Sequence, residues 1–370
     1  MAIETPKESI TQVTIPQVNL EDDLQSQIES VSANGVPVKI VGGNTKAFYG
    51  HAVDALAIDV SSHSGIVDYD PAELVITLRT GCKLKDVESL LAENNQMLGF
   101  EPPHFGDEAT IGGIVASGLT GPRRAFSGAI RDFILGIRLL NGRGEIVNFG
   151  GRVIKNVAGF DVSRLMVGAL GTLGVLLEVS IRVIPKFEAE TTLVFEHADA
   201  QAHIDWINQQ RRLPYPISAS VWYQGQTKIR LSGSQQGLDS ACQDLGRDNK
   251  MECDEIWYEL KEQSHAFFGQ MKTIARVSVP SVEPDFLTAE SQLIEWGGAQ
   301  RWVEASQDRL EPLRQQMQYH RGTVCAYRGY DGDAGLFQRP TDSMMTLHRN
   351  LKSSFDPAGI FNPGRLYPGL

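Results

Sequence analysis

The segment that decides the fold reads Pro37-Val38-Lys39-Ile40-Val41-Gly42-Gly43-Asn44-Thr45. Its first half is a short apolar run that predicts a β-strand. The two glycines that follow let successive backbone N–H groups converge on one point, because no Cβ atom interferes. Such a nest binds anionic oxygen, typically that of a phosphate. A branched side chain at Gly43 would fill the space that the phosphate needs. The alternative for this segment taken alone is an ordinary tight turn.

Two further glycine clusters follow. The first spans residues 109–118 and reads Ala-Thr-Ile-Gly-Gly-Ile-Val-Ala-Ser-Gly. Its small residues would let a flat ligand pack closely, and the hydroxyls of Thr110 and Ser117 suit phosphate or ribityl oxygens. The second spans residues 168–174 and precedes a long strand. For these clusters the alternatives are close chain packing in the core and a turn at a strand entry.

The rest of the first half alternates short strands and helices. Apolar spacing predicts helices over residues 21–33 and 83–94 and strands over 37–41, 56–60, 74–79 and 175–184. The turn Asn141-Gly142-Arg143-Gly144 joins residues 137–140 and 145–149 in a predicted hairpin. Common nucleotide motifs are absent, since there is no G-x-x-x-x-G-K-[ST] and the one G-x-G has Val147 in place of the third glycine. A P-loop and a nicotinamide-binding Rossmann unit are therefore excluded.

Composition limits the function class. The net charge of -11 argues against nucleic acid as a partner, since phosphate neutralisation needs clustered Lys and Arg. Neither an apolar run long enough to span a bilayer nor a secretory signal is present, so a cytoplasmic protein is expected. The cysteines form no C-x-x-C pair, so no zinc or iron–sulfur site and no other metal site is predicted. Buried reduced thiols are expected at these four positions: Cys82, Cys242, Cys253 and Cys325.

The chain is long enough for two domains. Glycine becomes less frequent after about residue 188, where we place a domain boundary. The expected division is a first domain over 1–187, an α+β domain over 188–354, and a tail over 355–370. The tail is dense in turn-forming residues and must wrap over another part of the molecule.

Taken in order, the clusters resemble the FAD-binding domain of the vanillyl-alcohol oxidase superfamily. The residues that match the family's motifs are Val41 to Thr45, Thr110 to Gly113, Gly171 to Gly174, Arg131-Asp132 with Lys155 to Asp161, and the tail motif Asp356 to Gly364. The resemblance implies an α+β fold, with a two-subdomain FAD-binding domain followed by a smaller α+β cap domain. It also implies FAD as the cofactor.

Within that superfamily the chain is most similar to the E subunits of bacterial glycolate oxidase (glycolate dehydrogenase). Pro122-Arg123-Arg124 and the ending Phe361 to Tyr367 carry this likeness. The family implies oxidation of glycolate to glyoxylate with a non-nicotinamide electron acceptor. It also implies a complex with a second, larger flavoprotein subunit and an iron–sulfur subunit, with attachment to the inner membrane through those partners. The expected cofactor-binding residues are Val41, Gly42, Gly43, Asn44, Thr45, Thr110, Ile111, Gly112, Gly113, Ser117, Gly118, Gly171, Thr172, Leu173 and Gly174.

The sequence also departs from catalytic relatives. They usually carry a motif of His-x-Gly-Asp-Gly-Asn-x-His character, whereas the later histidines here are scattered. Many have Ser-Glu before Gly-Thr-Leu-Gly, where Ala169-Leu170 stand in this chain, and often Lys at the position of Arg365. These differences leave the catalytic residues unassigned. They also leave open a self-sufficient FAD-dependent 2-hydroxy acid dehydrogenase and a flavin-empty assembly subunit.

A 2-hydroxy acid oxidase needs a cation for the carboxylate and a base for the hydroxyl. The candidate cations are Arg123, Arg124, Arg328 and Arg365, and the candidate bases are His320, Tyr327 and His348. A structural or surface role is the alternative for each. Asn44 follows the first glycine pair, and residues 109–118 contain neither His nor Cys, so we expect FAD to be held noncovalently.

Overall fold

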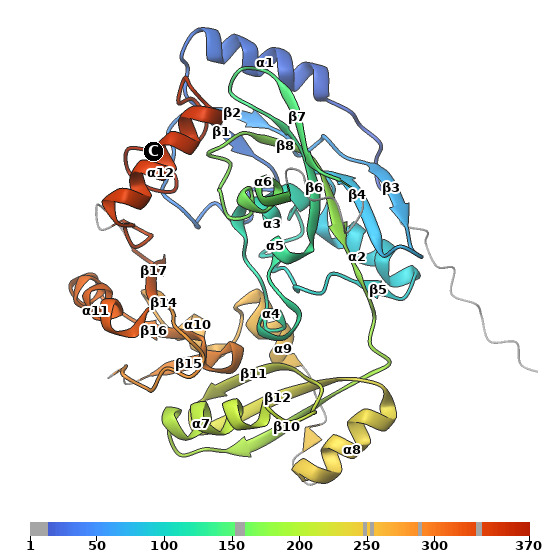
Figure 1. Cartoon of the computed structure of the whole chain (residues 1–370), viewed down its shortest axis with the longest axis vertical. Helices are drawn as coiled ribbons and strands as arrows, with labels where there is room; N and C mark the ends of the chain where they lie inside the picture. The colour runs from blue at the N-terminus through green and yellow to red at the C-terminus, as the bar shows by residue number, and fades with distance from the viewer. Residues whose placement is uncertain (1–13, 152–159, 247–249, 252–254, 288–290, 331–334) are drawn as a thin grey trace, which may run out of the picture.

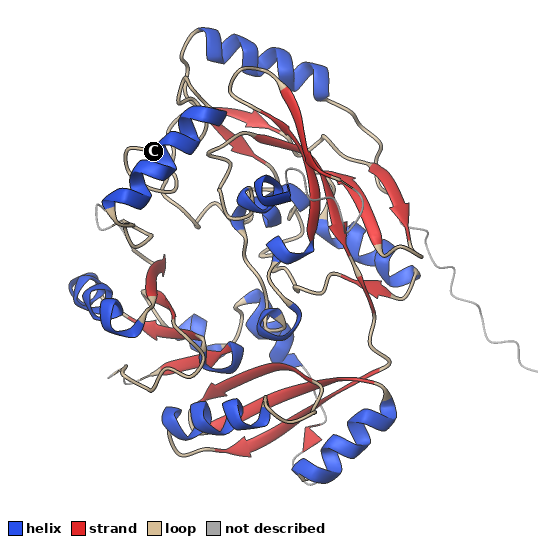
Figure 2. Ribbon diagram, in the orientation of Figure 1, coloured by secondary structure: helices blue, strands red, loops and turns tan. Residues whose placement is uncertain are grey.

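The computed structural model describes residues 14–151, 160–246, 250–251, 255–287, 291–330 and 335–370. The part of the Lys155 to Asp161 motif before Phe160 and also Cys253 lie outside these residues. Figures 1 and 2 show two bodies joined by an extended segment near residue 187, with the chain returning to the first body at its C-terminal end.

The first body contains most of the elements predicted from the sequence. They are α1 (Glu21–Ala33), β1 (Val38–Val41), β2 (Leu56–Asp59), β3 (Ile66–Asp70), β4 (Val75–Arg79), α2 (Leu84–Glu93), β5 (Gln96–Met97), α3 (Ile111–Ser117), α4 (Arg124–Ser127), α5 (Ile130–Phe133), β6 (Ile134–Leu140), β7 (Ile146–Gly150), α6 (Phe160–Leu165), β8 (Val175–Arg182) and β9 (Ile184–Pro185). The predicted hairpin over 137–149 is confirmed as β6 and β7.

Two sheets organise this body. β1 and β2 pair in parallel, and α1 packs against them through Leu24 and Ile28. A separate antiparallel sheet has the order β3-β4-β8-β6-β7. Its central strand β8 alternates buried and partly exposed residues at its start, as a strand between two others with one covered face should. Helices α2 and α3 share the core of this sheet.

The second body is built on one long antiparallel sheet with the order β13-β10-β12-β11-β15-β16-β14-β17. Its elements are β10 (Ala189–Glu196), α7 (Ala200–Gln210), β11 (Ile217–Tyr223), β12 (Gln226–Gly233), α8 (Gln235–Leu245), β13 (Lys250–Met251), α9 (Glu255–Glu262), α10 (Ala266–Gln270), β14 (Ile274–Ser278), β15 (Gln292–Glu295), η2 (Trp296–Gly298), β16 (Gln300–Glu304), α11 (Gln307–His320) and β17 (Thr323–Arg328). We call this sheet with its helices the cap.

The last helix, α12 (Asp342–Phe355), lies against the first body rather than the cap (Figure 1). The Lys352 ammonium is buried there and donates hydrogen bonds to the carbonyl of Thr172 at 2.7 Å and to Asp356 at 2.7 Å. The backbone N–H of Val38 then donates to Ile360, and that of Asn362 donates to Val38, so the tail extends the small sheet. Contact with the first body therefore begins within α12, before the tail that was expected to start at residue 355. The domain limits themselves remain a prediction.

A buried ionic cluster fastens the cap to the first body. Arg123 precedes α4 and is 1% exposed. It donates to Glu101 at 3.2 Å and to Glu190 of β10 at 2.5 Å, and Arg230 of β12 pairs with Glu101 at 2.8 Å. The two arginines hold the pKa of the Glu101 carboxyl below its ordinary value, although burial acts in the opposite direction. Because these charges are paired and desolvated together, removing one partner would leave a buried charge uncompensated.

Candidate cofactor site

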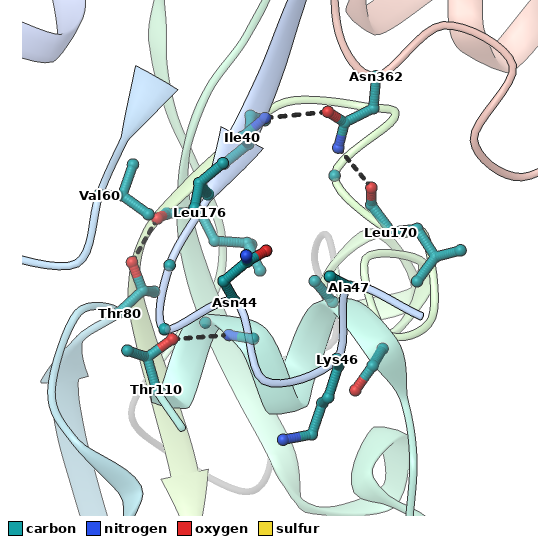
Figure 3. Close-up of a pocket in the computed structure, with 18 of the residues that line it drawn as sticks. Ile40, Asn44, Lys46, Ala47, Val60, Thr80, Thr110, Leu170, Leu176 and Asn362 are labelled. Carbon is teal, nitrogen blue, oxygen red and sulfur yellow. Dashed lines mark hydrogen bonds between the residues drawn. The ribbon is translucent and has the colours of Figure 1, made fainter. Parts of the chain in front are cut away.

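A pocket in the first body lies where the three glycine clusters meet (Figure 3). It contains about 780 Å³ of space between atoms, part of it open to solvent. Its lining residues are Ile40, Val41, Gly42, Gly43, Asn44, Thr45, Lys46, Ala47, Val60, Thr80, Thr110, Gly112, Gly113, Ala116, Ser117, Leu170, Gly171, Gly174, Leu176, Asn362 and Arg365. Most of the expected cofactor-binding residues are therefore brought together.

The loop after β1 presents unused backbone donors to this pocket. Among the described residues, no protein acceptor takes a hydrogen bond from the backbone N–H groups of residues 43–46. A succession of free N–H groups binds anionic oxygen. This arrangement fits a pyrophosphate at the place where the glycine pair predicted one.

The structure corrects the role of the glycine pair. A Cβ atom on Gly43 would lie 1.5 Å from the backbone oxygen of Glu108, and one on Gly42 would lie 2.6 Å from Oγ1 of Thr110. Gly43 does not adopt a left-handed conformation; Asn44 does, with a φ of 57°. The glycines thus allow the loop to pack against residues 108–110. A side chain at Gly43 would therefore disturb the packing of the loop as well as fill the space expected for the phosphate.

The second cluster forms a short helix that the sequence analysis did not predict. Thr110 caps α3, and its Oγ1 accepts from the N–H of Gly113 at 3.3 Å. The helix turns Gly112, Gly113 and Ser117 toward the pocket. Two expected site residues lie elsewhere. Ile111 is fully buried in the core beside the sheet β3-β4-β8-β6-β7. Gly118 ends the helix in a left-handed conformation against Gly168.

The third cluster divides in the same way. Gly171 and Gly174 line the pocket. Leu173 packs in the core, and Thr172 is 3% exposed with its hydroxyl donated to the carbonyl of Ala169 at 2.7 Å. The two outer residues of this motif line the pocket and the two inner residues lie in the core, so Thr172 and Leu173 do not reach the pocket.

The C-terminal tail closes one wall of the pocket. Asn362 accepts from the N–H of Ile40 at 2.9 Å through Oδ1 and donates to the carbonyl of Leu170 at 2.6 Å (Figure 3). Arg365 donates to the carbonyls of His51 and Tyr49, at 2.9 and 3.1 Å. The sequence analysis matched the Asn-Pro-Gly motif but did not place Asn362 among the site residues. That motif was the signal that would have found it.

Lys46 is a further pocket residue that the sequence analysis missed. Its ammonium is 9% exposed and donates to the hydroxyl of Thr45 at 3.2 Å and to the carbonyl of His104 at 3.0 Å. Burial lowers the pKa of Lys46 to about 8, while Glu262 acts in the opposite direction. A cation at this position supports the binding of an anionic cofactor.

Most candidate cations have structural partners. Arg123 is held in the ionic cluster at the cap, and Arg365 positions the loop around residue 50. Arg124 stacks on the ring of Trp296 at 4.4 Å, and Arg328 donates to Gln263 at 2.8 Å. Only Arg365 among these four lines the cofactor pocket.

The candidate bases are dispersed. His320 lies at the end of α11, hydrogen-bonded to Glu283 at 2.8 Å and stacked on Phe286. His348 lies on α12 against the ring of Tyr367. Tyr327 is 2% exposed, accepts from Gln263 at 2.9 Å, and burial raises its pKa above the ordinary range. No pair of these bases shares a site in the described part of the chain.

Two features are absent from the described residues. No group of three or more His, Cys, Asp or Glu side chains is placed to hold a metal ion. No described helix has the length and apolar character needed to cross a bilayer.

Comparisons with known proteins agree with this geometry. A family model described as an FAD binding domain matches residues 15–150. The chain is 41% identical over 349 residues to the glycolate oxidase subunit GlcE of Escherichia coli (strain K12), covering 94% of this chain and 97% of that protein. It is 30% identical over 186 residues to the glycolate oxidase subunit GlcD of Bacillus subtilis (strain 168), covering 49% of this chain and 39% of that one.

A D-lactate dehydrogenase of Anaerostipes hadrus is 29% identical over 203 residues, covering 52% of this chain and 42% of that protein. The chain thus spans less than half the length of this relative and of GlcD. The solved structure of an alkyldihydroxyacetonephosphate synthase aligns with a TM-score of 0.65 at 15% identity, covering 92% of this chain and 74% of that one. With the family match, this likeness confirms the predicted α+β FAD-binding fold of the vanillyl-alcohol oxidase type.

Proposed function

We propose a function from one premise: this chain belongs to the family of the glycolate oxidase subunit GlcE. We infer that it is the FAD-binding subunit of a multi-subunit enzyme that oxidises glycolate to glyoxylate and passes electrons to a non-nicotinamide acceptor. The structural observation that carries the cofactor assignment is the row of unused backbone donors over residues 43–46.

The residues of the pocket have distinct tasks in this proposal. The N–H groups of residues 43–46 and the ammonium of Lys46 would hold the pyrophosphate. Asn362 fixes the distance between β1 and the Leu170 loop through its two hydrogen bonds. Ala116, Val60 and Leu176 supply apolar surface that keeps water away. When bound, FAD supplies the acceptor for the two electrons that leave the hydroxy acid.

We also propose that FAD is held noncovalently. The described lining contains no His or Cys, and Asn44 occupies the position after the glycine pair.

We propose a second flavoprotein subunit and an iron–sulfur subunit as partners. GlcD is itself named as a subunit of glycolate oxidase, and it aligns with half of this chain. Attachment to the inner membrane would pass through those partners.

The test is purification of the chain alone. The proposal expects a yellow protein that releases FAD on denaturation and reduces a dye with glycolate only after reconstitution with its partner subunits. A yellow chain that alone matches the complex in kcat per flavin would replace this proposal with a self-sufficient 2-hydroxy acid dehydrogenase. A colourless chain that still restores activity to its partners would indicate an assembly subunit.

A further inference from the structure

A small chamber lies between the first body and the cap, next to the cofactor pocket. Its walls come from residues 119–121 after α3 and from the cap, whose polar side chains there are Lys261, Gln263, Arg276, Glu295, Gln300 and Tyr327. The chamber adjoins the pocket because residues 116–117 line the pocket and Leu119 lines the chamber. Both spaces therefore share one short stretch of chain.

Arg276 lies in this chamber without an acidic partner among the described residues. It sits on β14, and its Nη2 donates to the hydroxyl of Tyr49 at 2.8 Å. Its guanidinium lies 5.6 Å from the ring of Tyr49 and 5.5 Å from that of Tyr327. A guanidinium stays protonated and has five N–H donors, so most of its hydrogen-bonding capacity is unused here. The side chain is half-buried, so its remaining donors face a space that a small anion can enter.

A second cation strengthens the positive potential. Arg124 lies close enough to Arg276 for their charges to repel, and this repulsion, after burial, lowers the pKa of Arg124. Arg124 rests on the ring of Trp296, and Asp132 opposes the lowering of its pKa. Glu295 lines the chamber beside Arg276, but burial raises its pKa to about 7, so below that pH its carboxyl is largely neutral. Under those conditions the two guanidinium groups favour the entry of a small anion.

The chamber also contains an unused acceptor. Gln300 is 3% exposed, and its Nε2 donates to Oε2 of Glu295 at 3.1 Å. This bond uses the amide nitrogen, which is the donor end of the side chain. It leaves Oε1 of Gln300 buried without a hydrogen-bond partner in the described part of the chain. A ligand that brings a hydroxyl donor would satisfy it.

The register of the cap sheet places the two groups at a suitable separation. Arg276 pairs with Trp302, and Ser278 pairs with Gln300 on the adjacent strand β16. Arg276 and Gln300 are therefore diagonal neighbours on one face, with Cβ atoms within about 8 Å. Their side chains could hold the two ends of a molecule that carries a carboxylate and a hydroxyl on adjacent carbons.

We propose that this chamber is a binding site for a small 2-hydroxy acid, with Arg276 holding the carboxylate and Gln300 accepting the hydrogen bond of the hydroxyl. The chamber is small, with about 300 Å³ of space between atoms, part of it open to solvent, so only a compact acid such as glycolate is a candidate ligand. The inference rests on the proposed function and goes beyond it, because it places substrate contacts in this subunit itself.

The test measures binding of radiolabelled glycolate to the full FAD-loaded chain by equilibrium dialysis, without partners and without turnover. Wild type should bind glycolate saturably. Arg276→Gln should weaken binding by about tenfold or more, since the bidentate, charge-assisted hydrogen bonds between the guanidinium and the carboxylate are lost. Arg276→Lys keeps the positive charge but cannot form the bidentate pair, so its affinity for glycolate should lie between those of wild type and Arg276→Gln. Arg339→Gln removes an exposed positive charge paired with Asp342 and should leave binding unchanged.

The hydroxyl contact has its own test. Wild type should prefer glycolate over acetate, which lacks the hydroxyl, and Gln300→Met should abolish that preference while still binding acetate. Flavin content and circular dichroism confirm that each variant is folded. An Arg276→Lys chain that is folded and binds glycolate as tightly as wild type would overturn the assignment of Arg276. A flavin-containing wild-type chain that binds no glycolate would overturn the assignment of the chamber as a binding site and leave the proposed function intact. A chain without flavin would refute the proposed function.

Discussion

Glu295 offers a test of the electrostatics inside the cap. Its carboxyl is 3% exposed and accepts hydrogen bonds from Trp302 at 2.6 Å and from Gln300 at 3.1 Å, both through Oε2. Burial raises the pKa of Glu295 from 4.5 to about 7, although both hydrogen bonds act in the opposite direction. The desolvation of the carboxylate therefore outweighs its two donors.

The sign and size of the effect on stability follow from this pKa. Between pH 4.5 and 7 the folded chain holds a proton that the unfolded chain has released, so the contribution of Glu295 to stability falls as pH rises through this window. One pKa unit corresponds to about 1.4 kcal/mol, so the rise from 4.5 to about 7 sets a ceiling of about 3 kcal/mol. Glu295→Gln keeps a neutral acceptor for Trp302 and removes the ionisation.

We therefore expect Glu295→Gln to match wild type within about 1 kcal/mol at pH 5 and to exceed it by up to about 3 kcal/mol at pH 8. The assay is urea unfolding followed by tryptophan fluorescence. It reports on the cap, because all five tryptophans lie between residues 206 and 302. Glu93→Gln, at an exposed position on α2, serves as the control. A difference between Glu295→Gln and wild type that stays constant from pH 5 to pH 8 would refute the reasoning.

Three further predictions concern the cofactor pocket. Gly43→Ala should lower both the flavin-to-protein ratio and the melting temperature, since its Cβ would lie 1.5 Å from the backbone oxygen of Glu108. Gly269→Ala, whose Cβ meets no atom within 4 Å, should leave both unchanged, and an unaltered melting temperature in Gly43→Ala would contradict the packing argument. Lys46→Met should weaken FAD binding by about tenfold at pH 7. Wild-type affinity should decline above about pH 8 as the ammonium loses its proton, so a fluorescence titration in which both proteins show the same pH profile would exclude Lys46 from the site. Acid precipitation should release the yellow colour into the supernatant, and colour retained in the pellet would mean that FAD is attached covalently.

The sequence alone determined the class of fold and the location of the glycine-containing loop that lines the pocket. The strand before Gly42 and the three glycine clusters carry local signals, because strand patterning and glycine backbone freedom depend on neighbouring residues in the chain. The helix α3 was not predicted from the sequence, because its two glycines and its β-branched residues have low helix propensity. Packing in the tertiary core stabilises it instead.

Only the tertiary structure decided which side chains face a common space. Thr172 and Leu173 belong to a matched motif yet lie in the core, while Asn362 enters the pocket from the far end of the chain. The chamber at Arg276 cannot be predicted from the sequence for the same reason. Arg276 and Gln300 become neighbours only through the register of β14 with β16, and Leu119 joins them only when the cap packs on the first body. Such contacts depend on long-range strand pairing and burial, which no local pattern of residues encodes.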